Sequence, residues 1–69
     1  MKIKIGTKIQ HCIFGGQVLT GAVEEIEICK PDEKYGRMVN SVDTAKHRNG
    51  VVCLDNGHWC YFDQIRRVL

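Results

Sequence analysis

Four residues that could carry chemistry lie close together near the C-terminal end of the chain. Asp55 and His58 flank an Asn-Gly pair, and Cys53 and Cys60 lie just outside them. A carboxylate beside a histidine can orient a general base, and a nearby cysteine can act as a nucleophile. A cross-strand pair at a turn is also a common stabilising contact. Nothing in the sequence supplies an oxyanion hole or a cleft, so we expect the protein not to be an enzyme.

The cysteines also raise the question of disulfides or a metal. Cys12 and Cys29 bring their number to four, which would allow three disulfide connectivities. Structural zinc sites use closely paired ligands, and the chain has no C-x-x-C or H-x-x-x-H pair beside Cys53, His58 and Cys60. No signal peptide is recognisable at the N-terminus, so we expect a cytoplasmic protein with reduced thiols and no metal or cofactor. Disulfide-bonded and metal-bound cysteines stay open as alternatives.

Length and composition limit the architecture that can position these side chains. The chain has 69 residues, 43% of them hydrophobic, and a formal net charge of +2. This length allows a single domain over residues 1–69 and no second core. The apolar content is ordinary for a globular domain, and no apolar stretch is long enough to cross a membrane. A deep catalytic cleft is not expected in so small a domain.

Hydrophobic residues in the N-terminal segment recur with a period of two, which is typical of strands. One parity carries lysines and a glutamine, and Gly6 is expected to mark a bend or bulge. The other parity is mostly apolar and consists of Ile3, Ile5, Thr7, Ile9, His11 and Ile13. We therefore predict one or two strands with an apolar face and a basic face.

The next elements follow from turn signals and alternation. Gly15-Gly16 predicts a tight turn, and residues 22–29 predict a half-exposed strand with a bulge near Glu24-Glu25. A short helix over 22–29 is the competing interpretation. Residues 31–36 and 44–50 are expected to be polar loops on either side of a strand over 37–43. A short helical turn over 63–65 and a closing strand over 66–68 complete the chain.

The C-terminal hairpin carries the clearest signal. Asn56-Gly57 between strand-forming residues predicts a two-residue turn. In that register Cys53 faces Cys60 across the hairpin. One face, expected to line the core, then holds Val52, Leu54, Trp59 and Tyr61. The other face, expected to be exposed, holds Val51, Cys53, Cys60 and Phe62.

These five to six short antiparallel strands predict an all-β domain, and a small barrel would leave no open sheet edge. The segment Ile3-Lys4-Ile5-Gly6-Thr7-Lys8-Ile9 resembles the first strand of SH3-like barrels of the Tudor and KOW type. Gly21-Ala22-Val23 with Ile26 is similar to their second strand, Val52 to Gly57 to their fourth strand and turn, and Tyr61 to Ile65 to their closing helical turn. The resemblance implies an SH3-like barrel that binds nucleic acids, peptides or modified side chains.

The first functional hypothesis is a non-enzymatic interaction module. An exposed apolar face on the hairpin would be an interface for a protein partner or for a second copy of the chain. The residues of this predicted interface are Val51, Cys53, Cys60 and Phe62. A related hypothesis is an aromatic cage for a cationic ligand, built from Tyr35, Trp59 and Tyr61, although aromatic residues in so small a barrel more often belong to the core.

The second hypothesis is weak nucleic-acid binding. Charge is unevenly distributed: residues 1–20 hold three lysines and no acids, whereas residues 21–36 hold five acids and two lysines. Cationic side chains on one face can neutralise phosphates. If the termini lie close together, the basic residues at both ends could form one surface. The candidate residues are Lys2, Lys4, Lys8, Lys46, Arg48, Arg66 and Arg67.

Overall fold

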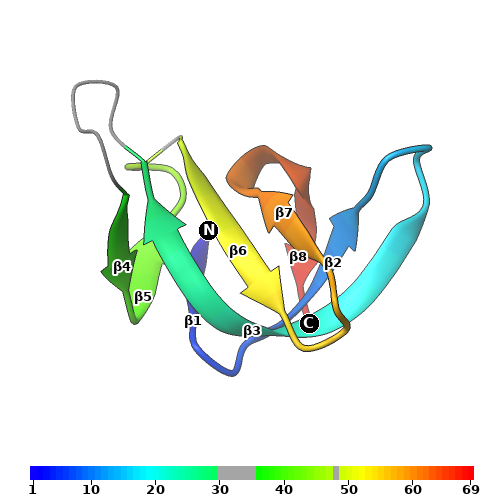
Figure 1. Cartoon of the computed structure of the whole chain (residues 1–69), viewed down its shortest axis with the longest axis horizontal. Helices are drawn as coiled ribbons and strands as arrows, with labels where there is room; N and C mark the ends of the chain where they lie inside the picture. The colour runs from blue at the N-terminus through cyan, green and yellow to red at the C-terminus, as the bar shows by residue number, and fades with distance from the viewer. Residues whose placement is uncertain (30–35, 48) are drawn as a thin grey trace.

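The structure, a computed structural model, describes residues 1–29, 36–47 and 49–69. Its elements, shown in Figure 1, are β1 (Lys2–Lys4), β2 (Lys8–Cys12), β3 (Val18–Ile28), β4 (Arg37–Val39), β5 (Ser41–Asp43), β6 (Gly50–Leu54), β7 (Trp59–Tyr61), the 3-10 helix η1 (Phe62–Gln64) and β8 (Ile65–Val68). All strand pairs are antiparallel, so the predicted all-β class is confirmed. The predicted loop over 31–36 lies, apart from Gly36, outside the described residues.

The long strand β3 organises the sheet. Its first half pairs with β2, and its second half pairs with β6 on one side and β4 on the other. The strand path runs β7-β6-β3-β2-β8, and β1 pairs with β5 as a separate two-stranded ribbon. Figure 1 shows β3 curving from the β4 side of the molecule to the β2 hairpin. The curvature lets the two halves of β3 enclose a common core.

The sheet does not close, which corrects the prediction of a closed barrel. The strands β7 and β8 stand at opposite ends of the strand path and are joined by η1. The backbone N–H of Tyr61 at the end of β7 donates to the side-chain Oε1 of Gln64 at 2.8 Å. This bond begins η1 and occupies a donor that a further strand would need. The helical turn therefore starts at Phe62, one residue earlier than predicted.

Glycine conformation and a bulge explain how the N-terminal half folds. Gly6 has φ +90° and separates β1 from β2, so the predicted bend is confirmed. The bend breaks the apolar parity, because Ile5 is 43% exposed while Ile3 and Ile9 are buried. The register between β3 and β6 shifts between Val23 and Glu25, as predicted. The strand prediction for this segment is confirmed and the alternative helix is wrong.

The core is one cluster with residues from the six-stranded sheet, from the β1–β5 ribbon and from η1. The predicted strand over 37–43 is divided at Asn40 into β4 and β5, and β5 brings Val42 against Ile3 of β1. At the start of β6, a Cβ at Gly50 would collide with the Phe62 ring, so the ring packs where a side chain is missing. The buried apolar residues are Ile3, Ile9, Val23, Ile26, Ile28, Val42, Val52, Leu54, Cys60, Phe62 and Ile65.

Candidate functional site

The hairpin between β6 and β7 has a three-residue loop. Leu54 N–H donates to His58 O at 2.9 Å, which leaves Asp55, Asn56 and Gly57 as the loop. Gly57 has φ +83°, the left-handed residue that such a loop needs at its end. The predicted two-residue turn is therefore wrong. Its tertiary cause is visible: Asp55 Oδ1 accepts from Ala22 N–H at 2.9 Å, which ties the loop to β3.

The longer loop shifts the register by one residue and turns β7 over. Cys53 pairs with Trp59 instead of Cys60, and Val52 pairs with Cys60. Because side chains alternate between sheet faces, this slip exchanges the two faces of β7. Two residues expected at the interface, Cys60 and Phe62, are 0% and 5% exposed and belong to the core. Conversely, the aromatic side chains expected in the core, those of Trp59 and Tyr61, are 55% and 53% exposed.

The outer side of the hairpin is formed by Val51, Cys53, Trp59 and Tyr61, called the aromatic face below. Val51 and Cys53 are half-buried and keep the outward orientation predicted for them. The rings of Trp59 and Tyr61 are edge to face, with centroids 5.2 Å apart and planes at 88°. Such a pair holds two large rings in a fixed arrangement while leaving about half of each side chain in solvent.

Two hollows adjoin the ring of Tyr61. An apolar hollow of about 280 Å³ lies towards the β2–β3 hairpin and is lined by Ile13, Phe14, His58, Trp59, Tyr61 and Gln64. A smaller hollow of about 160 Å³, called the Asp63 hollow below, lies towards the start of β6 and is lined by Cys29, Asn49, Gly50, Val51, Tyr61 and Asp63. Phe14, at the hairpin tip, is fully exposed. Tyr61 therefore lies between the apolar hollow and a hollow whose wall includes the carboxylate of Asp63.

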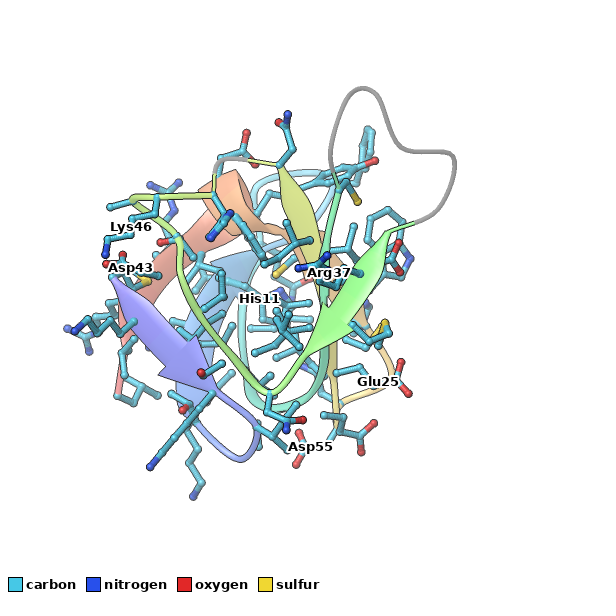
Figure 2. All side chains as sticks on the ribbon, turned by 90° about the vertical axis from the view of Figure 1, so that its left-hand side faces the viewer. His11, Glu25, Arg37, Asp43, Lys46 and Asp55 are labelled. Atoms are coloured by element: carbon cyan, nitrogen blue, oxygen red, sulfur yellow. The ribbon has the colours of Figure 1, made fainter. Side chains whose placement is uncertain are left out.

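Acidic side chains border the aromatic face. Glu25 and Glu27 of β3 are in register with Cys53 and Val51 of β6, so the four residues share the outer side of the sheet. Figure 2 shows Glu25 at the periphery of the molecule, whereas His11 lies in its centre. Burial, and next the negative charges of these glutamates, raise the pKa of Cys53. Among the described residues, the charged side chains of β3 that border the aromatic face are therefore acidic.

The candidate basic residues fall into two groups. On the outer side of β2 and β8, Lys8 lies near Arg67, which pairs with Gln10. The neighbouring Arg66 donates from Nε to Cys12 Sγ at 2.8 Å. These three basic side chains are exposed. The pairing of β2 with β8 thus brings basic residues from both ends of the chain together.

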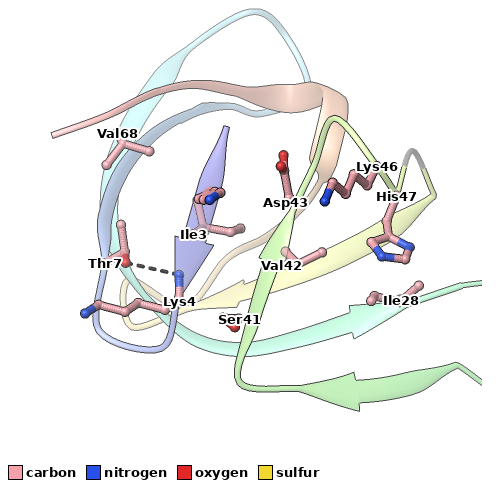
Figure 3. A pocket seen from close by; sticks show the side chains of 11 residues that line it. Ile3, Lys4, Thr7, Ile28, Ser41, Val42, Asp43, Lys46, His47 and Val68 are labelled. Atoms are coloured by element: carbon pink, nitrogen blue, oxygen red, sulfur yellow. Dashed lines mark hydrogen bonds between the residues drawn. The ribbon is translucent and has the colours of Figure 1, made fainter.

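The second basic group borders a groove of about 650 Å³ beside the β1–β5 ribbon. Figure 3 shows Lys4 and Lys46 on different sides of this groove, with Ile3 and Val42 between them. Lys2 also lines it. The acid in the groove is Asp43, whose pKa is lowered chiefly by a hydrogen bond from Ala45 N–H. Arg48, the remaining candidate, lies outside the described residues.

A histidine is buried in the centre of the fold. The side chain of His11 is 0% exposed, and its Nε2 lies 3.1 Å from Asn56 Nδ2. Asn56 Oδ1 accepts from His58 N–H, so the amide nitrogen is the donor to His11. Nε2 must then be the acceptor, and the neutral ring carries its proton on Nδ1, which has no hydrogen-bond partner among the described residues. Burial lowers the pKa of His11.

The residues first considered for chemistry are not assembled into a reactive site. Asp55 is bound to the backbone of β3 rather than to His58, which is exposed. Burial raises the pKa of Cys60 to about 11, so its thiol stays protonated at neutral pH. The four cysteines are free thiols. The described residues contain no group of three or more His, Cys, Asp or Glu side chains placed to hold a metal ion.

The residues predicted for the interface did not include the exposed Phe14, Trp59 and Tyr61. The aromatic-cage hypothesis did name Trp59 and Tyr61, and its third residue, Tyr35, lies outside the described residues. Phe14 could have been found, because it precedes the Gly15-Gly16 turn and must stand near a hairpin tip. Trp59 and Tyr61 had no local signal, since their orientation depends on the contacts that set the loop length.

No helix in the described part of the chain is both long and apolar enough to span a membrane. Comparison with protein-family models, with curated proteins and with solved structures finds no match to this chain.

Proposed function

We propose that the protein is a small interaction module that binds a protein partner through the aromatic face. The observation that carries this proposal is the exposure of Trp59 and Tyr61, side by side, on a sheet whose other side is the core. Exposed Trp and Tyr are typical anchors of protein interfaces, because they contribute large contact areas at low conformational cost. Phe14 and the apolar hollow extend the same surface.

A display selection with random peptides tests this proposal and requires no identified partner. We expect recovered peptides to lose at least tenfold in affinity for Trp59→Ala and for Tyr61→Ala, as anchor residues do. The matched control is Ile5→Ala, which truncates a 43% exposed apolar side chain at the β1–β2 bend. Peptides that bind both aromatic variants as tightly as the parent chain would contradict the proposal.

Association with a second copy is the other form of this proposal. Under that form the mass in solution rises with protein concentration, and Tyr61→Asp keeps the protein monomeric. The ring of Tyr61 is half-exposed, so this substitution should leave the fold intact. Circular dichroism checks that the variant is folded. A parent chain that stays monomeric at every concentration would exclude the homodimer and leave a different protein as the partner.

A second candidate function is nucleic-acid binding through the basic group on β2 and β8. The pairing of these strands, which places Arg67 near Lys8, favours it. Retention on a DNA or RNA column should fall steeply with rising salt, because phosphate contacts release counterions. The variant Lys8/Arg67→Glu, which reverses two charges of this group, should lose retention. Equal retention of the variant and the parent would remove this candidate, whereas binding at the aromatic face should persist at high salt.

We also propose a relationship to the SH3-like barrels, of a form that stays open between β7 and β8. The strand path and the helical turn before the last strand support it. The pairing of the last strand with β2 is the feature to test. Nuclear Overhauser contacts between Ile9 and Val68 are expected in solution, and their absence would overturn the relationship.

A further inference from the structure

We infer that the aromatic face recognises a peptide segment carrying both an apolar side chain and a Lys or Arg side chain, one placed on each side of Tyr61. This inference deepens the proposed function and rests on it. The apolar side chain would occupy the hollow beside Phe14 and Trp59. The cationic side chain would occupy the hollow beside Val51 and Asp63.

The Asp63 hollow fits the chemistry of a cation. Its walls include the ring of Tyr61, whose face attracts a positive charge, and Asp63, whose carboxylate can pair with it. Val51 and Cys29 supply apolar wall for the methylene stem of a Lys or Arg side chain. An aromatic ring, a carboxylate and apolar wall together match a long cationic side chain better than a neutral one.

Charge around the aromatic face selects the same partner. At the outward positions of β3 and β6 in this part of the sheet, the charged side chains are Glu25 and Glu27. With Glu24 as a smaller contributor, they raise the pKa of Cys53 beyond the effect of burial, in keeping with their position beside the middle of the face. The only ion pair among the described residues is the one between the Met1 ammonium group and Asp43, which belongs to the β1–β5 ribbon and involves neither glutamate. An acidic segment would be repelled here, and a basic one attracted.

The apolar hollow argues against a purely ionic partner. Ile13, Phe14 and Trp59 offer contact area to an aliphatic or aromatic side chain and little to a charge alone. The rings of Trp59 and Tyr61 hold each other at 88°, so this wall is preformed. The segment recognised is therefore amphipathic rather than polycationic, which separates it from a general affinity for basic proteins.

The experiment measures the affinity of recovered peptides by titration, each made with Arg at its cationic position and with citrulline at that position. Citrulline keeps the shape of arginine without its charge. We expect citrulline to weaken binding about tenfold, from the combined cation–π and ion-pair contributions. Asp63→Asn should weaken binding of the charged peptide to a similar degree and leave the citrulline peptide unchanged. The matched control is Glu24→Gln, which removes the same charge from an exposed position that lines neither hollow. Of the three glutamates of β3, Glu24 acts least on Cys53, so this variant should change affinity less than twofold.

The outcomes separate the inference from the proposed function. Peptides that need Trp59 and Tyr61 but bind equally with citrulline would overturn the inference and keep the binding function. Peptides insensitive to both aromatic variants would overturn both. The chain also offers a test that needs no partner, because Trp59 is its only tryptophan. A negative field should make Cs⁺ a more effective quencher of its emission, relative to the same ions on free tryptophan, than I⁻, and the reverse order would contradict the inference.

Discussion

The register of the β6–β7 hairpin predicts that Cys60 and Cys53 differ sharply in thiol reactivity. Cys60 is 0% exposed, and burial raises its pKa to about 11 from an ordinary value of 9.0. At about pH 8 only about one Cys60 thiol in a thousand is then ionised, against about one in ten for an ordinary cysteine. Direct alkylation of Cys60 should be about a hundredfold slower for this reason alone.

Alkylation of Cys60 through transient unfolding is slowed to a similar degree. A domain of this size is stable by about 3 kcal/mol or more, so the open state that exposes Cys60 makes up less than about one hundredth of the molecules. Cys53 is half-buried on the outer side and reacts without unfolding, although its pKa is also raised.

Alkylation with iodoacetamide, followed by mass spectrometry of the labelled peptides, measures both rates. The variant Cys53→Ser isolates Cys60 as the only hairpin thiol, and labelling in concentrated guanidinium chloride gives the unprotected rate. We expect Cys60 to be protected about a hundredfold or more and Cys53 much less. With a two-residue turn both thiols would face outward and label at similar rates. Rates within about tenfold of each other would refute the register and the exposure of the aromatic face.

Three further predictions concern the interior and the glycines that shape it. The pKa of His11 is lowered in the fold, so unfolding takes up a proton at pH values below the ordinary pKa of 6.5. The contribution of His11 to stability should therefore be constant above that pH and fall below it by up to about 1.4 kcal/mol per pH unit. Denaturant titrations should show a weaker pH dependence for His11→Gln, and an equal slope in both proteins would be the contrary result. Gly57→Ala places a Cβ at φ +83° and should cost about 1–2 kcal/mol in denaturant unfolding; no loss would mean that the loop has another conformation. Gly50→Ala forces the Phe62 ring to move and should cost about 1–3 kcal/mol, and a variant as stable as the parent in thermal unfolding would show that the ring lies elsewhere.

The sequence predicted the elements whose cause is local. The bend at Gly6 needs a left-handed backbone conformation, and Gly-Gly marks the β2–β3 turn because both residues have positive φ. The bulge near Glu24-Glu25 follows from a break in alternation that only an extra residue can repair. Each of these features is decided by a few neighbouring residues, so a sequence pattern is enough to locate it.

The orientation of β7 could not be predicted in this way. Asn-Gly is compatible with loops of two or three residues, and the choice is made by bonds to distant segments, from Ala22 N–H to Asp55 and from the Asn56 amide to Thr20 O. A change of one residue in the loop then exchanges Trp59 for Cys60 at the surface. The hairpin was therefore the right place for the candidate site, while half of its residues were assigned to the wrong side.

The prediction of barrel closure was wrong for a related reason. The need to protect sheet edges favours closure in general, but here Gln64 occupies the Tyr61 N–H and the chain turns away as η1. The strand β7 stands at one end of the strand path, and it carries the exposed rings of Trp59 and Tyr61. The edge that the sequence argument expected to be hidden is thus part of the proposed binding surface.

The most direct test of the proposed function follows the emission of Trp59 while a peptide from the display selection is added. Because the chain has one tryptophan, its signal reports only on the aromatic face. The proposal predicts that emission shifts to shorter wavelength and becomes less accessible to acrylamide, with a midpoint equal to the Kd from calorimetry. A peptide that binds by calorimetry while the wavelength and quenching of Trp59 stay unchanged would place the binding site elsewhere and contradict the proposal.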